Sequence, residues 1–377
     1  MMTDKERVNA AFNGQPVDRM PVYPSYLTLY QQDHFHELTG YPRHHFQKWL
    51  YSPQEEFIAT LRSLTDTTPF DILQAPYLPT DSAWRNTKYI EKDGCAYLLD
   101  SATGQTRNVT MRTESDHAED YQVNEKVLVR DLQDLRSKCP IVRANDLLKD
   151  GAAERYVEIV EAFANDKFIL TGGVAGTIYS ASEYVGQTNA LAMFLQKPDF
   201  MHEICKHWRE KSVEWIRTLC SAGGDAIYLD DATATSDMIS PAIYEEFCVP
   251  YISTIVKEAQ SLGHKVILIY FGGVMDRLEQ IASTGADALA MEASMKGYTN
   301  DLEQAAQRIG DRMTLFGNVN PYDHLQQLEE SALKKIMQEQ AEAGRGARGF
   351  IMATGSPITM GTPLTRVQKF IQLAHQI

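Results

Sequence analysis

The chain has 377 residues, of which 44% are hydrophobic, and it carries a formal net charge of −14. That length supports a large core, in either one large α/β domain or two smaller ones. The acidic balance argues against a general nucleic-acid binder. No apolar run approaches the about 18 residues that a membrane span needs, and the first residues form a charged pattern without a signal core. The five cysteines show no metal-binding spacing. We therefore expect free thiols in a soluble, cytoplasmic protein.

The amino-terminal part of the chain predicts one helix and two short strands. Thr3 can cap a helix that stops at Asn13-Gly14. Residues 18–24 predict a first strand, and residues 70–75 predict a second strand between two prolines. Residues 86–115 then alternate polar and apolar side chains around two glycine-containing turns. This pattern predicts a small antiparallel insertion after the second strand.

A regular alternation of apolar strands and helices follows. Residues 132–166 are helical in pattern with a break at Pro140, and further helices are expected over 180–194, 198–221 and 242–262. The predicted strands between them are residues 168–173, 226–229, 266–271, 288–292, 313–318 and 349–354.

Together with the two early strands, this makes eight strands joined by helical connections. Such a chain closes most naturally into a (β/α)8 TIM barrel, here one domain over residues 1–377 with the hairpin insertion at about 86–115. A doubly wound open sheet is the alternative, but no GxGxxG motif follows any strand. In a barrel, the chemistry lies at the carboxyl ends of the strands and in the loops after them.

Four carboxylates fall at or near predicted strand ends: Asp71, Asp230, Asp231 and Glu292. Any of them could act as a general acid or base if desolvation raises its pKa. Each also has a structural interpretation. One of the paired aspartates could cap a turn, Glu292 could pair with Lys296 or Arg312, and Asp71 could be a buried ion pair.

Polar and aromatic residues gather at the same strand ends and predict a substrate pocket, although a single tyrosine is more often core packing. The candidates are Tyr23, Tyr26, Tyr77, Tyr179, Tyr270, Asn318 and Ser356.

Histidines after the first strand have a ligand-like spacing. They are His34, His36, His44 and His45, and they could bind a metal, although loop histidines are usually exposed polar residues.

Several motifs in order along the chain resemble the uroporphyrinogen decarboxylase superfamily. They are residues 15–22, Asp71-Ile72-Leu73, Ile239-Ser240-Pro241 with the helix that follows, and Leu315 to Val319. The resemblance implies a (β/α)8 barrel over nearly the whole chain and suggests a homodimer. It also implies one of two activities, the heme-pathway decarboxylase or cobamide-dependent methyl transfer between a small substrate or thiol and a corrinoid protein.

The sequence departs from the decarboxylase branch. The arginine-bearing segment that holds substrate carboxylates in that branch is replaced by Pro24 to Thr28, and its late histidine falls at about Ser356. Asp71 matches the spacing of the essential aspartate, with an ambiguous upstream register. An acidic chain without those arginines would hold a polycarboxylate poorly, so decarboxylation ranks second.

The sequence also departs from the thiol-activating methyltransferases. Their zinc ligands fall at Ile269, Phe271 and Ser356, none of which is a good zinc ligand, so a thiol acceptor is disfavoured. The O-demethylating members are more similar, because paired aspartates, a polar loop and Ile-Ser-Pro resemble residues 230–241. Those members bind zinc through carboxylates and histidine, and a zinc site that includes Glu292 stays open here.

The leading hypothesis is methyl transfer from a small methylated or methoxylated compound to a separate corrinoid protein. Asp230, Asp231 and Glu292 would polarise the leaving group as acid or metal ligands, and Asp71 would orient the substrate. The alternatives are a decarboxylase or lyase that acts on a small acid through Asp71 and Tyr270, and a non-catalytic barrel that binds a metabolite.

Overall fold

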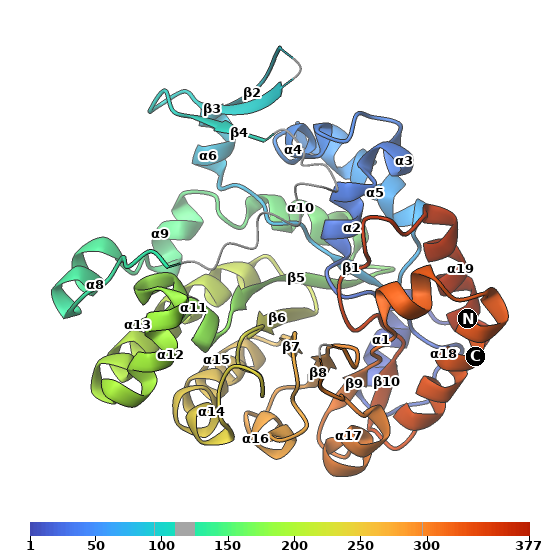
Figure 1. The fold of residues 1–377 in the computed structure, drawn as a ribbon. Helices are drawn as coiled ribbons and strands as arrows, with labels where there is room; N and C mark the ends of the chain where they lie inside the picture. Colours follow the sequence, from blue (N-terminus) through green and yellow to red (C-terminus); the bar gives the residue numbers. More distant parts are fainter. Residues whose placement is uncertain (94, 110–124, 296) are drawn as a thin grey trace.

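The computed structural model describes residues 1–93, 95–109, 125–295 and 297–377. Within these residues, a curled parallel sheet of seven strands forms the centre, and helices surround it (Figure 1). Neighbouring strands follow the chain order, as the repeated strand–helix unit dictates. The strands are β1 (Ile72–Gln74), β5 (Phe168–Ala175), β6 (Ala226–Asp230), β7 (Lys265–Tyr270), β8 (Ala288–Met291), β9 (Thr314–Phe316) and β10 (Gly349–Ile351).

Val22 closes the barrel between its first and last strands. It forms an isolated parallel bridge with Met352, where the Tyr23 amide donates to the Met352 carbonyl at 2.9 Å. On its other side, the Asp71 amide donates to the Val22 carbonyl at 3.1 Å. The predicted strand over 18–24 is therefore only a bridge, because Pro21 and Pro24, on either side of Val22 and Tyr23, cannot donate ladder hydrogen bonds. The predicted (β/α)8 barrel is confirmed.

The helices cover the outer face of the barrel, and short helices from the amino-terminal part of the chain form a cap beside it (Figure 1). The first group is α1 (Asp4–Phe12), α2 (Leu27–Asp33), α3 (Phe35–Thr39), α4 (His45–Leu50), α5 (Gln54–Thr67), α6 (Asp81–Asn86), α8 (Leu132–Lys138), α9 (Ala144–Lys149) and α10 (Glu154–Phe163). The second is α11 (Thr177–Val185), α12 (Gln187–Gln196), α13 (Pro198–Ser221), α14 (Pro241–Phe247), α15 (Val249–Ser261), α16 (Leu278–Ser283), α17 (Leu302–Ile309), η1 (Pro321–Gln326), α18 (Glu330–Gly344) and α19 (Leu364–Ala374).

Local sequence signals explain where several helices begin and end. Thr3 and Glu6 form the predicted capping box of α1. The Ser240 hydroxyl caps α14, as predicted, but the single helix expected over 242–262 is two helices that meet at Cys248. Two residues later, Pro250 supplies no amide hydrogen to continue the α14 ladder, which separates α14 from α15.

The insertion is an antiparallel sheet of three strands beside the barrel. It consists of β2 (Thr87–Lys92), β3 (Cys95–Asp100) and β4 (Thr106–Asn108). Asp93 and Gly104 turn the chain with φ of 54° and 72°. The predicted insertion is confirmed to residue 109, while Gly94 and residues 110–115 lie outside the described residues.

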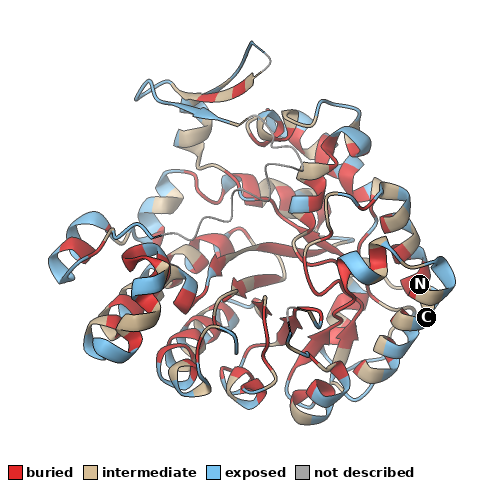
Figure 2. Cartoon of the chain, in the orientation of Figure 1, coloured by how far each residue is buried: buried red, intermediate tan, exposed pale blue. Residues whose placement is uncertain are grey.

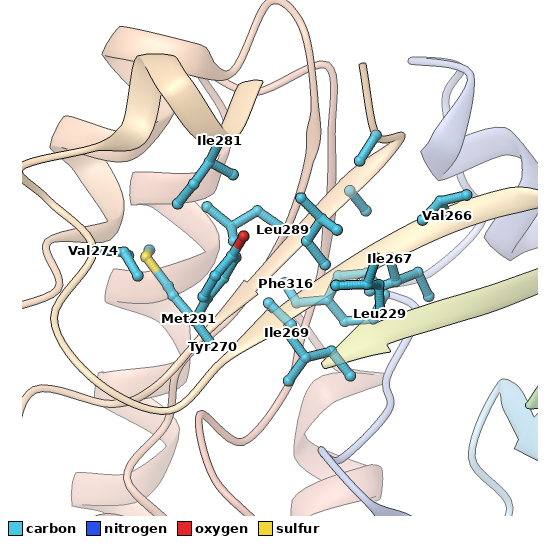
Figure 3. Packing of buried hydrophobic residues seen from close by; sticks show 14 of the residues in the cluster. Leu229, Val266, Ile267, Ile269, Tyr270, Val274, Ile281, Leu289, Met291 and Phe316 are labelled. Atoms are coloured by element: carbon cyan, nitrogen blue, oxygen red, sulfur yellow. The ribbon is translucent and has the colours of Figure 1, made fainter. Parts of the chain in front are cut away.

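Buried residues make up the strands and the helix faces that cover them (Figure 2). The close view in Figure 3 shows Tyr270 of β7 among Val274, Ile281, Leu289 and Met291, in the layer between barrel and helices. In the part of the chain that the structure describes, no helix combines the length and apolar character required to cross a membrane.

Candidate active site

Asp230 and Tyr26 meet inside the carboxyl end of the barrel. Asp230 is the last residue of β6, and the period of two along a strand puts it on the same face as Tyr228. The Tyr26 hydroxyl donates a hydrogen bond to Oδ2 of Asp230. The Tyr26 ring lies against those of Tyr228 and Phe271, with centroids 5.9 and 5.5 Å away. The carboxyl group is therefore held by one phenol in an aromatic environment.

The backbone of Tyr26 adopts an uncommon conformation for a residue that is not glycine. Its φ is 53°, in the left-handed region, at the position just before α2. Such conformations cost about 1–3 kcal/mol and are found more often at functional sites. Here the conformation accompanies the hydrogen bond between the Tyr26 hydroxyl and Asp230.

Burial raises the pKa of Asp230 to about 6, against the hydrogen bonds from Tyr26 and the Ala232 backbone, which lower it. Its other oxygen, Oδ1, is buried without a well-formed hydrogen bond. A carboxyl group with this pKa exists in both protonation states near neutral pH. Asp230 is therefore suited to hold and release a proton.

Asp231 faces the opposite side of the sheet and caps a neighbouring helix. Its carboxylate accepts the backbone amides of Thr177 at 3.0 Å and Ile178 at 3.3 Å, at the start of α11. The cap residue of that helix is Gly176, which has no side chain of its own and no room for a Cβ beside Asp231. Burial raises the pKa of Asp231 to about 7. The capping interpretation is thus favoured, although the helix it caps precedes Asp231 in the chain.

Glu292 follows β8 and forms a second polar group in the barrel mouth. The Ser356 hydroxyl donates to its Oε1 at 3.1 Å, and the Tyr298 hydroxyl donates to its Oε2. Of the predicted ion-pair partners, Lys296 lies outside the described residues, and Arg312 lies 3.6 Å from Asp311. The structure therefore brings Glu292 and Ser356 together, as expected for two strand ends of one barrel.

Asp71 lies at the opposite end of the barrel, which corrects its predicted place at the mouth. It precedes β1, and its carboxylate contacts Arg7 at 2.7 Å and Arg19 at 3.0 Å. The Val22 amide donates to the same carboxylate at 2.9 Å. Although burial opposes ionisation, His375, Arg19, Val22 and Arg7 together lower its pKa to about 2. Asp71 is a buried ion pair that cannot orient a substrate in the mouth.

Two further predicted pocket residues serve the framework instead. The Tyr270 hydroxyl lies 2.5 Å from that of Tyr244 in α14, outside the barrel wall, so its predicted contact with substrate is wrong. The Asn318 amide donates to the Asn300 carbonyl at 2.9 Å and accepts from Gln340 at 3.0 Å. These bonds join the loops after β8 and β9 to α18.

Tyr23 lies inside the barrel and is buried. Its hydroxyl donates to Oε1 of Gln74 at 2.8 Å, and its ring packs edge-on against Phe316 at 6.4 Å. Burial raises the pKa of Tyr23 well above its usual value, so this phenol stays protonated.

A cavity of about 1200 Å³ opens beside these residues, between the barrel, the short helices and the insertion. Tyr77 and Tyr179, both predicted pocket residues, line it and are 82% and 43% exposed. The cavity reaches Gly173 to Ala175 of β5, which pair with residues 228–230 of β6. Asp230 and Glu292 do not themselves line it. Asp230 is thus beside the cavity wall, because it pairs with Ala175 on the neighbouring strand, and it is partly exposed.

Sequence reasoning missed much of this cavity lining, because the residues lie on helices and on the insertion and not at strand ends. They include three cationic side chains and two tryptophans: Arg43, Arg107, Lys211, Trp208 and Trp215. The available signal was the spacing of Trp208, Lys211 and Trp215, which places the three side chains on one face of α13.

The residues of the mouth do not fit a zinc site. The three family ligand positions are Ile269, Phe271 and Ser356, and Ser356 already donates to Glu292. Among residues 1–93, 95–109, 125–295 and 297–377, no three His, Cys, Asp or Glu side chains converge at the mouth. The one such group in these ranges is His44, His45 and Glu91, on α4 and the insertion.

A family model for uroporphyrinogen decarboxylase (URO-D) matches residues 128–377. The chain belongs to this family. A uroporphyrinogen decarboxylase of Coxiella burnetii is 30% identical over 212 residues, covering 53% of this chain and 56% of the relative. The uroporphyrinogen decarboxylase 2 of Arabidopsis thaliana chloroplasts is 27% identical, covering 54% of this chain and 52% of the relative. The matched region thus spans about half the length of these curated relatives.

A solved structure supports the fold of the whole URO-D-family chain. It is a methyltransferase from Methanosarcina mazei, which superposes with a TM-score of 0.69 at 20% identity. The match covers 100% of this chain and 99% of that one. The amino-terminal residues that the family model leaves out therefore belong to the same barrel.

Proposed function

We propose that this URO-D-family chain transfers a methyl group from a small methylated or methoxylated compound to a corrinoid protein. The observation that carries the proposal is the Asp230 carboxyl group, with its pKa raised to about 6 and its Oδ2 held by Tyr26. The end-to-end likeness in fold to the M. mazei methyltransferase supports it. A methyl ether or amine needs a proton on its leaving atom, and Asp230 can supply one.

The cavity suits a small substrate with a partner above it. Its volume of about 1200 Å³ exceeds the roughly 300–1,000 Å³ typical of small-molecule pockets. Tyr77 lines the cavity and is 82% exposed, so its ring offers an aromatic surface to a docking protein. The corrinoid of that partner, when docked, supplies the methyl acceptor.

The residues of this chain then handle the substrate and its proton. The substrate bond between the methyl carbon and its oxygen or nitrogen breaks, and the proton of Asp230 moves to that leaving atom. Tyr26 donates to the resulting carboxylate, which solvent reprotonates. The tryptophans of the cavity hold the apolar body of the substrate and exclude water.

The test is Asp230→Asn, measured by methyl transfer from a panel of methoxylated aromatic compounds to reduced cobalamin. Loss of a general acid lowers the rate about 10²–10⁴-fold. In the wild type, kcat/KM should fall as pH rises through about 6, because the protonated form of Asp230 is the active one. Asparagine cannot donate a proton, so this pH dependence disappears in the variant.

Asp225→Asn is the matched control, at the amino end of the same chain segment. Asp225 accepts from the Ile169 amide at 2.8 Å and pairs with Lys5 at 3.0 Å, far from the mouth. It should leave kcat/KM unchanged. If Asp230→Asn retains wild-type activity and pH dependence on a compound that the wild type demethylates, Asp230 is not the acid.

A second candidate, a lyase on a small carboxylic acid, is favoured by one observation. Arg43, Arg107 and Lys211 line the cavity and could bind carboxylates. The relatives named uroporphyrinogen decarboxylase agree with it. Against it, Asp71 and Tyr270 lie away from the mouth. Release of CO₂ from uroporphyrinogen or smaller acids, lost in Arg107→Ala, would favour this function over methyl transfer.

A further inference from the structure

A group of two histidines and a carboxylate joins the insertion to the helical cap. His45 Nε2 lies 2.7 Å from Oε1 of Glu91, and His44 Nε2 lies 3.7 Å from the same oxygen. One ligand atom from each of the three residues lies within 4.8 Å of the other two. The group is separate from Asp230 and Glu292, and the proposed methyl transfer does not use it.

The local structure of both elements directs these side chains toward one another. Tyr89 and Glu91 are two residues apart and therefore point to the same face of β2. The Tyr89 ring packs edge-on against the His45 ring, with centroids 5.9 Å apart. On the other side, His45 begins α4, and Lys48, three residues later, lies over the Tyr89 ring at 6.0 Å. The group thus results from packing between two elements and not from a single loop.

The donor set suits a first-row transition metal ion. Two imidazole nitrogens and one carboxylate oxygen are zinc ligands, and three protein ligands leave a fourth position for water. The ligand atoms need to close on a centre about 2.0–2.2 Å from each. His45 Nε2 and Glu91 Oε1, at 2.7 Å, are therefore already close enough to share one ion after a small adjustment.

We propose that His44, His45 and Glu91 bind a zinc-like divalent ion that fastens the insertion to α4. The two elements that this ion would join, α4 and the insertion, also line the 1200 Å³ cavity. They do so through Phe46 of α4 and Arg107 of β4. β4 pairs with β3, which pairs with β2, so an ion at Glu91 fixes the position of Arg107. The ion sets the rim of the cavity without taking part in the chemistry at Asp230.

The experiment titrates the full chain, freed of metal by a chelator, with ZnCl₂ and with CoCl₂. We expect one zinc ion to bind per chain. With cobalt, we expect a visible absorption spectrum of the kind given by four-coordinate cobalt. Glu91→Gln and His45→Ala should each weaken zinc binding by more than about tenfold, since loss of outer-sphere partners alone costs about 10–100-fold. Glu91 is half-exposed in its side chain, so its replacement does not threaten folding.

Glu37→Gln is the matched control, because Glu37 pairs with His34 at 3.0 Å outside the three-residue group. It should bind zinc as the wild type does. Amide exchange in residues 87–92 should slow on zinc addition in the wild type and the control, but not in Glu91→Gln.

Two results would overturn the proposed zinc site. One is the absence of stoichiometric zinc binding by the wild type. The other is binding that Glu91→Gln and His45→Ala leave unchanged, including binding that Glu292→Gln abolishes instead. Neither result bears on Asp230, whose test is methyl transfer.

Discussion

The two ends of the barrel treat buried carboxylates in opposite ways. At the amino end, Asp71 is fully buried but contacts two arginines, and its pKa falls to about 2. At the carboxyl end, Asp230 has a phenol as its partner, and its pKa rises to about 6. Burial penalises both charges, so the partner decides the sign. A charged partner makes a structural ion pair, and a neutral donor leaves a carboxyl group that can exchange its proton.

Position in the barrel explains why the partners differ. The amino end is held by α1, whose buried Arg7 reaches Asp18 at 2.7 Å as well as Asp71. The carboxyl end is covered by loops with aromatic and hydroxyl side chains, among them Tyr26 and Ser356. The amino end therefore balances its buried carboxylate with arginines, whereas at the carboxyl end the Asp230 carboxyl group has a neutral partner.

The largest expected effect comes from breaking the amino-end ion pair. Asp71→Ala leaves the Arg7 guanidinium, 1% exposed, without this partner, and should cost about 3–5 kcal/mol of unfolding free energy. In the wild type, the stability contributed by Asp71 is present above pH about 4 and lost as pH falls toward 2, because folding depresses its pKa. Urea unfolding at several pH values measures both. Asp311→Asn, at a side chain 82% exposed, is the control and should change little.

Asp231→Ala tests the capping interpretation at the other end. It removes the acceptor for two buried amides of α11 and should cost about 1–3 kcal/mol. Because folding raises the pKa of Asp231 to about 7, its ionisation lowers stability as pH rises from about 4 to 7. The variant should lose that pH slope, which is at most about 1.4 kcal/mol per pH unit. If kcat fell strongly in a variant that is still folded at the assay temperature, Asp231 would instead have a catalytic role.

Tyr26→Phe sharpens the contrast by removing the neutral partner alone. The Tyr26 hydrogen bond lowers the pKa of Asp230, so its loss should raise that pKa by about one unit. The pH at which kcat/KM falls should therefore move to a higher value. Tyr23→Phe loses a bond to Gln74 instead and should leave this midpoint in place. An unchanged midpoint in Tyr26→Phe would mean that Asp230 does not control the profile.

The smallest effect is expected for Tyr270→Phe, in the layer between barrel and helices. It removes one hydrogen bond with Tyr244 and should cost about 1 kcal/mol without changing KM. Thermal unfolding and steady-state kinetics together check this. A raised KM would return Tyr270 to the substrate pocket.

Features that depend on neighbours in the chain were predicted correctly, and a feature that depends on the end of the barrel was not. The hairpin, the cap of α1, the Ser240 cap of α14 and the alternation of strands and helices are local signals, and the structure confirms them. The mouth position of Asp230 and Glu292 also followed, because each stands at the carboxyl end of an apolar strand. The prediction for Asp71 was wrong because this residue comes just before its strand and not after it. Residues before a barrel strand lie at the amino end of the barrel, and residues after it lie at the carboxyl end.

The sequence by itself determined the barrel, its insertion, its superfamily and the two acids of the mouth, because strand period, turn residues and capping are set by neighbours in the chain. Only the tertiary structure decided what those acids contact. It assigned Asp231 to the start of α11, Tyr26 to Asp230 and Ser356 to Glu292. Side chains distant in the chain meet only once the barrel closes through Val22 and Met352, and a carboxyl group's pKa depends on the partners it finds there.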